Sequence, residues 1–100
     1  ANTTGQNNSA FGNLSLDANT TGGSNVGIGD NALGGNTTAS NNTAIGGAAL
    51  MANTTGTQNI AVGGEALKRN TTGDKNTAVG MQALSFNTTA YCHWCSFFRC

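Results

Sequence analysis

An unbroken 17-residue period constrains this chain more than any other feature. The triplet Asn-Thr-Thr begins at residues 2, 19, 36, 53, 70 and 87, and no residue is inserted or deleted between one start and the next. The five complete units share the consensus N-T-T-G-x-x-N-x-A-φ-G-x-x-A-L-x-x, in which φ is Phe, Ile or Val. Self-similarity at a fixed period is typical of repeat architectures in which each unit contacts only its neighbours.

The period and the residues that fill it favour an all-β fold, a parallel β-solenoid (a β-roll or β-helix) with one 17-residue repeat per coil. Successive coils stack about 4.8 Å apart, so equivalent residues form columns that a single insertion would disrupt. Helical solenoids usually need repeats longer than about 30 residues, and Asn, Thr and Gly are weak helix formers. Chains rich in these residues are often disordered, but disorder does not require a constant spacing.

The composition leaves little material for a conventional core. Asn, Thr, Gly and Ala occupy 59 of the 100 positions, which is unlike an ordinary globular domain. In the short strand N-x-A-φ-G, the residue after Asn and φ share one face and are mostly β-branched, so we expect this face to point inward. The Gly then turns the chain, and Leu fills the core from the opposite side. The predicted core columns are Phe11, Ile28, Ile45, Val62 and Val79, and Leu16, Leu33, Leu50, Leu67 and Leu84.

Two Asn residues per unit are expected to stack as hydrogen-bonded ladders that compensate for the thin core. The Ala and Gly residues on the other face of the strand are expected to let neighbouring chains approach closely. The predicted Asn ladders are Asn2, Asn19, Asn36, Asn53, Asn70 and Asn87, and Asn8, Asn25, Asn42, Asn59 and Asn76.

The composition changes abruptly after the repeats. We therefore divide the chain into a β-solenoid repeat array, residues 1–90, and a Cys/aromatic cap or contact segment, residues 91–100. Zinc sites normally pair two half-sites across a loop, so we expect no metal at the cysteines and the neighbouring His93. The residues available for a disulfide or a chain-to-chain contact are Cys92, Cys95 and Cys100.

Charge and motifs argue against several functions. The formal net charge is zero and only four residues are basic, whereas nucleic-acid binding needs a concentrated positive face. No apolar run approaches the roughly 20 residues of a membrane span, and the start of the chain shows no signal-peptide pattern. No nucleophile has a base at a useful spacing. We expect neither an enzyme nor a cofactor, neither a nucleic-acid partner nor membrane insertion.

The polar columns allow two further readings. Each NTT triplet is an N-x-[ST] glycosylation acceptor, and Asn7, Asn13 and Asn41 begin three more, although Asn and Thr also suit unmodified turns and ladders. A column of Thr could order water as an ice-binding surface, but the neighbouring Thr faces the opposite side of an extended strand. The first Thr column is Thr3, Thr20, Thr37, Thr54, Thr71 and Thr88.

The repeats also resemble a known group. Residues 53–67, NTTGTQNIAVGGEAL, and 70–84, NTTGDKNTAVGMQAL, resemble the NTTGxxNTAxGxxAL repeats of bacteriophage tail-fibre proteins and large surface proteins. The N-x-A-φ-G element is similar to the head repeats of trimeric autotransporter adhesins. The resemblance covers residues 2–86 and implies a β-solenoid or β-roll, often trimeric, that serves as a stalk or a receptor-binding surface. The segment φ-G-x-x-A-L also partly matches left-handed hexapeptide helices, which leaves the handedness and the number of sides open.

These observations favour a structural protein of an extracellular or virion fibre that assembles with copies of itself by stacking or trimerisation. The alternative is an adhesin or receptor-binding surface for glycans, because columns of Asn and Thr offer hydrogen bonds to sugars. Ice binding is a further alternative. The expected location is extracellular, at the cell surface or in a virion, and the expected partners are other copies of the chain or surface glycans.

Overall fold

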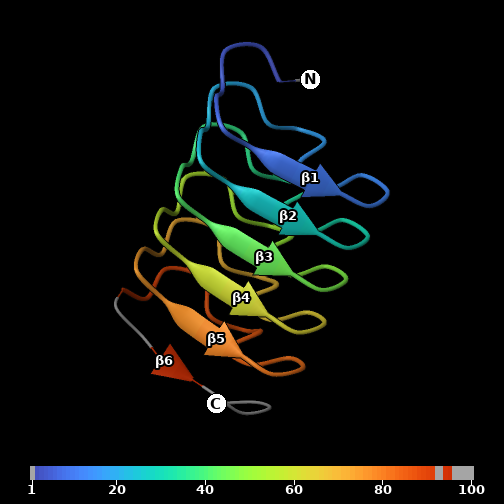
Figure 1. Ribbon diagram of the computed structural model, residues 1–100. Coiled ribbons are helices and arrows are strands. Elements are labelled where there is room, and N and C mark those ends of the chain that lie inside the picture. Colours follow the sequence, from blue (N-terminus) through green and yellow to red (C-terminus); the bar gives the residue numbers. More distant parts are fainter. Residues whose placement is uncertain (1, 92–93, 96–100) are drawn as a thin grey trace.

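The computed structural model describes residues 2–91 and 94–95. It is a β-solenoid with one short strand in each coil (Figure 1). The strands form one parallel sheet in chain order, and each strand residue pairs with the residue 17 positions further along. The predicted all-β solenoid with one repeat per coil is therefore confirmed. The strands are β1 (Ser9–Phe11), β2 (Val26–Ile28), β3 (Thr43–Ile45), β4 (Ile60–Val62), β5 (Thr77–Val79) and β6 (Trp94–Cys95).

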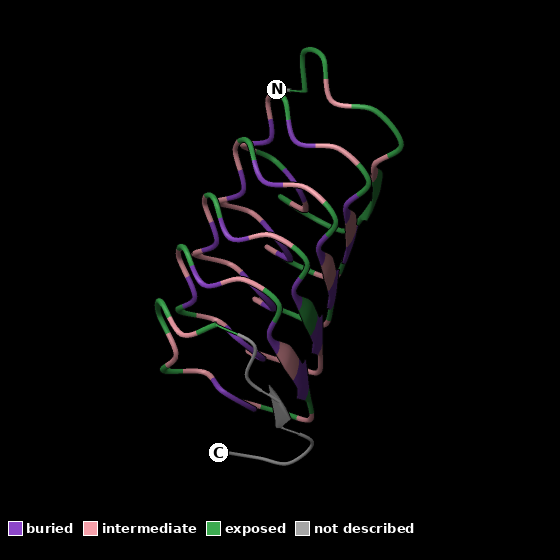
Figure 2. Cartoon of the chain, turned by 90° about the vertical axis from the view of Figure 1, so that its left-hand side faces the viewer, coloured by how far each residue is buried: buried purple, intermediate pink, exposed green. Residues whose placement is uncertain are grey.

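The solenoid winds in a left-handed sense. In Figure 1 the strands lie on the near side and run from left to right while the chain descends from its N-terminus, and the perpendicular view of Figure 2 places the same sheet at the right-hand edge. The remainder of each coil consists of bends and turns. The molecule measures 35 × 24 × 16 Å, so its short dimension leaves room for only a thin interior.

Strand β6 continues the sheet beyond the last Asn-Thr-Thr triplet. Thr77 of β5 pairs with Trp94, and Ala78 pairs with Cys95, in the register of all the other strands. The change in composition at residue 91 therefore does not end the strand ladder. The predicted end of the array at residue 90 falls inside the sixth coil.

The interior is built from Leu and Ala. Leu33, Leu50 and Leu67 are fully buried, which confirms the Leu core column. From the sheet side, the middle residue of each strand from β2 to β5 points inward, and it is Gly27 or one of the buried alanines of this column. Those alanines are Ala44, Ala61 and Ala78.

The second predicted core column is wrong, because the φ residues face outward. Phe11 is 78% exposed, Ile28 40%, Ile45 38% and Val79 41%, while Val62 is partly exposed. The reason is the short distance between the sheet and the Leu column. A Cβ atom added at Gly27 would lie 3.4 Å from Cγ of Leu16 and 2.8 Å from Oγ of Ser15. Only Ala or Gly fits on the inner face of the strand, so the β-branched residues occupy the outer face.

Tight corners close each coil. The Gly that follows each strand has a positive backbone φ angle. At Gly46 the angle is +131°, and an added Cβ would lie 2.6 Å from backbone atoms of Gly63. Ala48 and Leu50, in the same corner, also adopt the left-handed conformation, with φ angles of 60° and 51°. This conformation is costly for residues other than Gly. The Leu column accepts it because the corner turns each Leu side chain into the core.

Candidate interaction surfaces

The outer side of the sheet is an apolar surface, which we call the outward sheet face. It consists of the first and third residues of β1 to β5, and all of them are exposed or half-buried. Figure 2 shows this edge of the solenoid, where exposed and half-buried segments alternate with buried ones. No residue of the face is charged. Its members are Ser9, Phe11, Val26, Ile28, Thr43, Ile45, Ile60, Val62, Thr77 and Val79.

The first Asn ladder connects each coil to the next by side-chain hydrogen bonds. The side-chain amide of Asn36 donates to Oδ1 of Asn19 at 2.9 Å, and the amide of Asn53 donates to Oδ1 of Asn36 at 3.0 Å. The same Nδ2 atoms donate to the carbonyl oxygen three residues on, as from Asn36 to Ala39 at 3.1 Å. The contacts repeat from Asn2 to Asn87, so the predicted ladder is confirmed.

The second Asn ladder uses different atoms. Oδ1 of Asn25 accepts the backbone N–H of Asn42 at 3.0 Å, while Nδ2 of Asn25 donates to the carbonyl of Ala39 at 2.8 Å. Ala39 O thus accepts one bond from each ladder, since it also accepts from Asn36. The same pattern runs through Asn8, Asn42, Asn59 and Asn76. Within the described residues no buried side-chain N or O lacks a partner, which gives the sheet a fixed polar support.

The buried ladders bear on glycosylation. The Asn residues of the four central NTT triplets, Asn19 to Asn70, are buried, and their Nδ2 atoms donate two hydrogen bonds each. A glycan replaces one of the two hydrogens of Nδ2, so at least one of these bonds would have to break in a buried place. By contrast, Asn7, Asn13 and Asn41 are exposed. Among the described asparagines of the acceptor motifs, these three and Asn2 of the first coil have exposed side chains.

The two Thr columns also differ in their exposure and hydrogen bonds. In the first column, the hydroxyls of Thr20 and Thr54 donate to the backbone carbonyl of the Thr in the next coil, at 3.1 and 3.2 Å. The second column is exposed throughout. An ice-binding surface would need two exposed columns side by side, so the ice-binding hypothesis gains no support from this geometry. The exposed column is Thr4, Thr21, Thr38, Thr55, Thr72 and Thr89.

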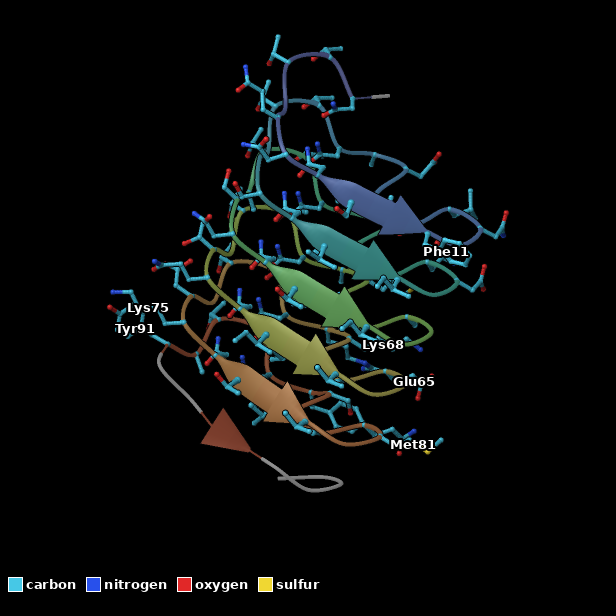
Figure 3. All side chains as sticks on the ribbon, viewed as in Figure 1. Phe11, Glu65, Lys68, Lys75, Met81 and Tyr91 are labelled. Carbon is cyan, nitrogen blue, oxygen red and sulfur yellow. The ribbon has the colours of Figure 1, made fainter. Side chains whose placement is uncertain are left out.

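Charged side chains gather at one corner of the fourth and fifth coils. Glu65 accepts hydrogen bonds from Nε2 of Gln82 at 2.8 Å and from Nζ of Lys68 at 3.2 Å. These hydrogen bonds, first that of Gln82, and the positive charge of Lys68 hold the pKa of Glu65 below its usual value. Figure 3 shows Glu65 and Lys68 at the edge of the sheet opposite to Lys75 and Tyr91. This group could not be predicted from the repeat pattern, because its members occupy variable positions of the repeat.

Only part of the cysteine segment lies within the described residues. Cys92, Cys100 and the neighbouring His93 lie outside the described residues, and Cys95 is described only by its backbone in β6. The predicted disulfide or contact at these cysteines therefore stays a prediction. In the described part of the chain, no cluster of three or more His, Cys, Asp or Glu side chains could hold a metal ion. The same residues include no helix of the length and apolarity that a membrane span requires.

Comparison with known families, with curated proteins and with solved structures found no match to this chain.

Proposed function

We propose that this chain is a structural repeat module of an extracellular or virion fibre, and that copies of it assemble through the outward sheet face. The observation that carries the proposal is the row of exposed, uncharged apolar side chains along β1 to β5. Soluble monomers rarely expose contiguous apolar patches above a few hundred Å², and larger ones mark interaction sites.

A second copy of the chain suits this face best. The face repeats its chemistry once in every coil, at a spacing of about 4.8 Å, so a partner that matches it along its whole length must have the same spacing. Another copy has this spacing by construction. The formal net charge of zero also means that two copies do not repel each other at long range.

The energy of the contact grows with the number of coils. Burying the exposed parts of the seven apolar side chains on the face gives roughly 5 kcal/mol per copy. Association costs about 4–15 kcal/mol in lost freedom and ordering. One pair of faces from a short rod therefore binds weakly, whereas three copies or a longer array bind firmly, as a fibre requires.

Sedimentation velocity over a range of protein concentrations tests the proposal. We expect concentration-dependent oligomers, and we expect the double variant Ile28→Lys, Ile45→Lys to remain monomeric while its circular dichroism stays that of the solenoid. The matched control is Thr21→Lys, Thr38→Lys, which places the same two charges on the exposed Thr column of the same coils. A wild-type chain that stays monomeric at high concentration, or a lysine pair that disrupts assembly equally from either position, contradicts the proposal.

A further inference from the structure

The last residue of the repeat changes character along the rod. It is small in the first three coils and large in the next two, where it becomes a cation and then an aromatic ring. A pocket of about 200 Å³ lies beside the two large residues. The last residues of the five units are Ala18, Gly35, Ala52, Arg69 and Phe86. The residues that line the pocket are Glu65, Lys68, Arg69, Gln82, Ser85 and Phe86.

An aromatic ring and a guanidinium lie together in this pocket. Phe86 is 67% exposed, and the guanidinium carbon of Arg69 lies 4.7 Å from the centre of its ring. A cation at this distance is attracted to the ring and is held in one place by it. The ring keeps a broad apolar surface in contact with solvent, beside donors that carry a positive charge.

The charged groups that line the pocket have a net positive charge, because they are Lys68, Arg69 and Glu65. The carboxylate of Glu65 is already engaged by Lys68 at 3.2 Å and by Gln82 at 2.8 Å. Two cations therefore face one carboxylate whose oxygens both have partners. The guanidinium of Arg69 is the group best placed to receive a further anion, because it presents several N–H donors in a planar fork that fits a carboxylate.

We propose that this pocket binds a carboxylate-bearing sugar unit, such as a uronate or a sialate. The C–H face of the sugar ring packs on Phe86, the sugar carboxylate pairs with Arg69, and hydroxyl groups bond to Gln82 and Ser85. The volume lies below the roughly 300 Å³ at which pockets for drug-sized ligands begin, which suits a single ring. One excess positive charge matches one carboxylate. None of the residues that line the pocket belongs to the outward sheet face, so the two proposals can be tested by separate substitutions.

NMR titration of the full chain with glucuronate, N-acetylneuraminate, glucose and acetate tests the proposal. We expect the amide signals around Gln82 and Phe86 to shift with either acidic sugar. For glucuronate, which has thirteen heavy atoms, we expect a dissociation constant of about 1 mM. Glucose and acetate each supply half of the recognised chemistry. We therefore expect both to bind at least about tenfold more weakly. Glucose lacks the hydrogen bonds to the charged Arg69, which are worth about one order of magnitude, and acetate lacks the ring that packs on Phe86.

Variants separate the two halves of the site. Arg69→Gln should reduce glucuronate binding about tenfold, to the level of glucose, and Phe86→Ala should weaken both sugars. The matched control is Lys75→Gln, because Lys75 also lies over an aromatic ring, 5.3 Å from the centre of Tyr91, at the opposite edge (Figure 3). Lys75→Gln should bind as the wild type does. The proposal is overturned if neither acidic sugar shifts these signals, if glucose or acetate binds equally well, or if Arg69→Gln binds glucuronate like the wild type. Sedimentation of the same variants reports on the sheet face separately.

Discussion

Replacing Asn53 by Ala tests whether the buried amide ladders, rather than the thin apolar core, stabilise the rod. Asn53 is fully buried. Its Nδ2 donates to Oδ1 of Asn36 at 3.0 Å and to the carbonyl of Gly56 at 2.9 Å, and its Oδ1 accepts from Nδ2 of Asn70 at 2.9 Å. Alanine removes all three bonds at once and leaves the backbone in place.

The size of the effect follows from which partners lose their only bond. Gly56 O keeps the donor of Asn42 at 2.8 Å, but Oδ1 of Asn36 loses the amide that it accepts from. A hydrogen bond contributes about 1 kcal/mol net, and a buried polar atom left without a partner costs about 1–3 kcal/mol. We therefore expect Asn53→Ala to lower the free energy of unfolding by roughly 3–5 kcal/mol.

Asn87 provides the matched control in the same column. It lies at the end of the ladder, is half-buried and donates to Oδ1 of Asn70 at 3.1 Å. Asn87→Ala removes this one bond and leaves Oδ1 of Asn70 without its amide donor, so it should cost about 1–3 kcal/mol, less than Asn53→Ala.

Urea unfolding followed by circular dichroism measures both values, at one fixed protein concentration because self-association shifts apparent stability. Hydrogen exchange adds the location, since solenoid repeats open locally, and protection should fall most in the coils on either side of Asn53. Equal losses for the two variants, or a loss below about 1 kcal/mol for Asn53→Ala, would refute the reasoning.

Three further predictions concern the corners and the charged group. Ala48→Gly removes the strain of a left-handed backbone at a φ angle of 60° and should raise the free energy of unfolding, measured with urea, by roughly 0.5–1 kcal/mol. Gly46→Ala places a Cβ 2.6 Å from the backbone of Gly63 at φ +131° and should cost roughly 2–6 kcal/mol in the same assay. Glu65 has a lowered pKa, so its contacts are complete above the usual value of 4.5 and are lost as the pH falls through the lower folded value. The side-chain amide signals of Gln82 should report this transition by NMR, and Glu65→Gln should abolish it.

The period was sufficient to predict the solenoid, the register, the Leu column and both Asn ladders. These features depend only on stacking equivalent residues, and stacking is what a constant spacing specifies. The atoms used by each ladder could not be predicted, because Asn36 and Asn25 have the same side chain and differ only in where the backbone directs it.

The prediction of which face of each strand points into the core is wrong. A strand has two faces, and the larger apolar residues, such as Ile45, were assigned to the interior by their hydrophobicity. The interior is limited by space instead, since Ala44 is the largest residue type found on the inner face of β2 to β5. The sequence does indicate this limit, because the middle residue of the strand is Ala or Gly in every unit. The sequence pattern alone suggests a contact between chains for these small residues, but in the structure they make the contact between the sheet and the Leu column.

The Asn ladder also determines how such a rod can change its length. Asn36 meets Asn19 above and Asn53 below through the same pair of atoms, so removing or duplicating one whole coil brings together two neighbours that fit each other equally well. A gene for this array can therefore gain or lose complete repeats by recombination, with each event altering the length by about 4.8 Å and leaving the cross-section as it was. Adding or removing complete coils therefore changes the length of the solenoid in fixed steps and leaves the side-chain contacts of the other coils unchanged.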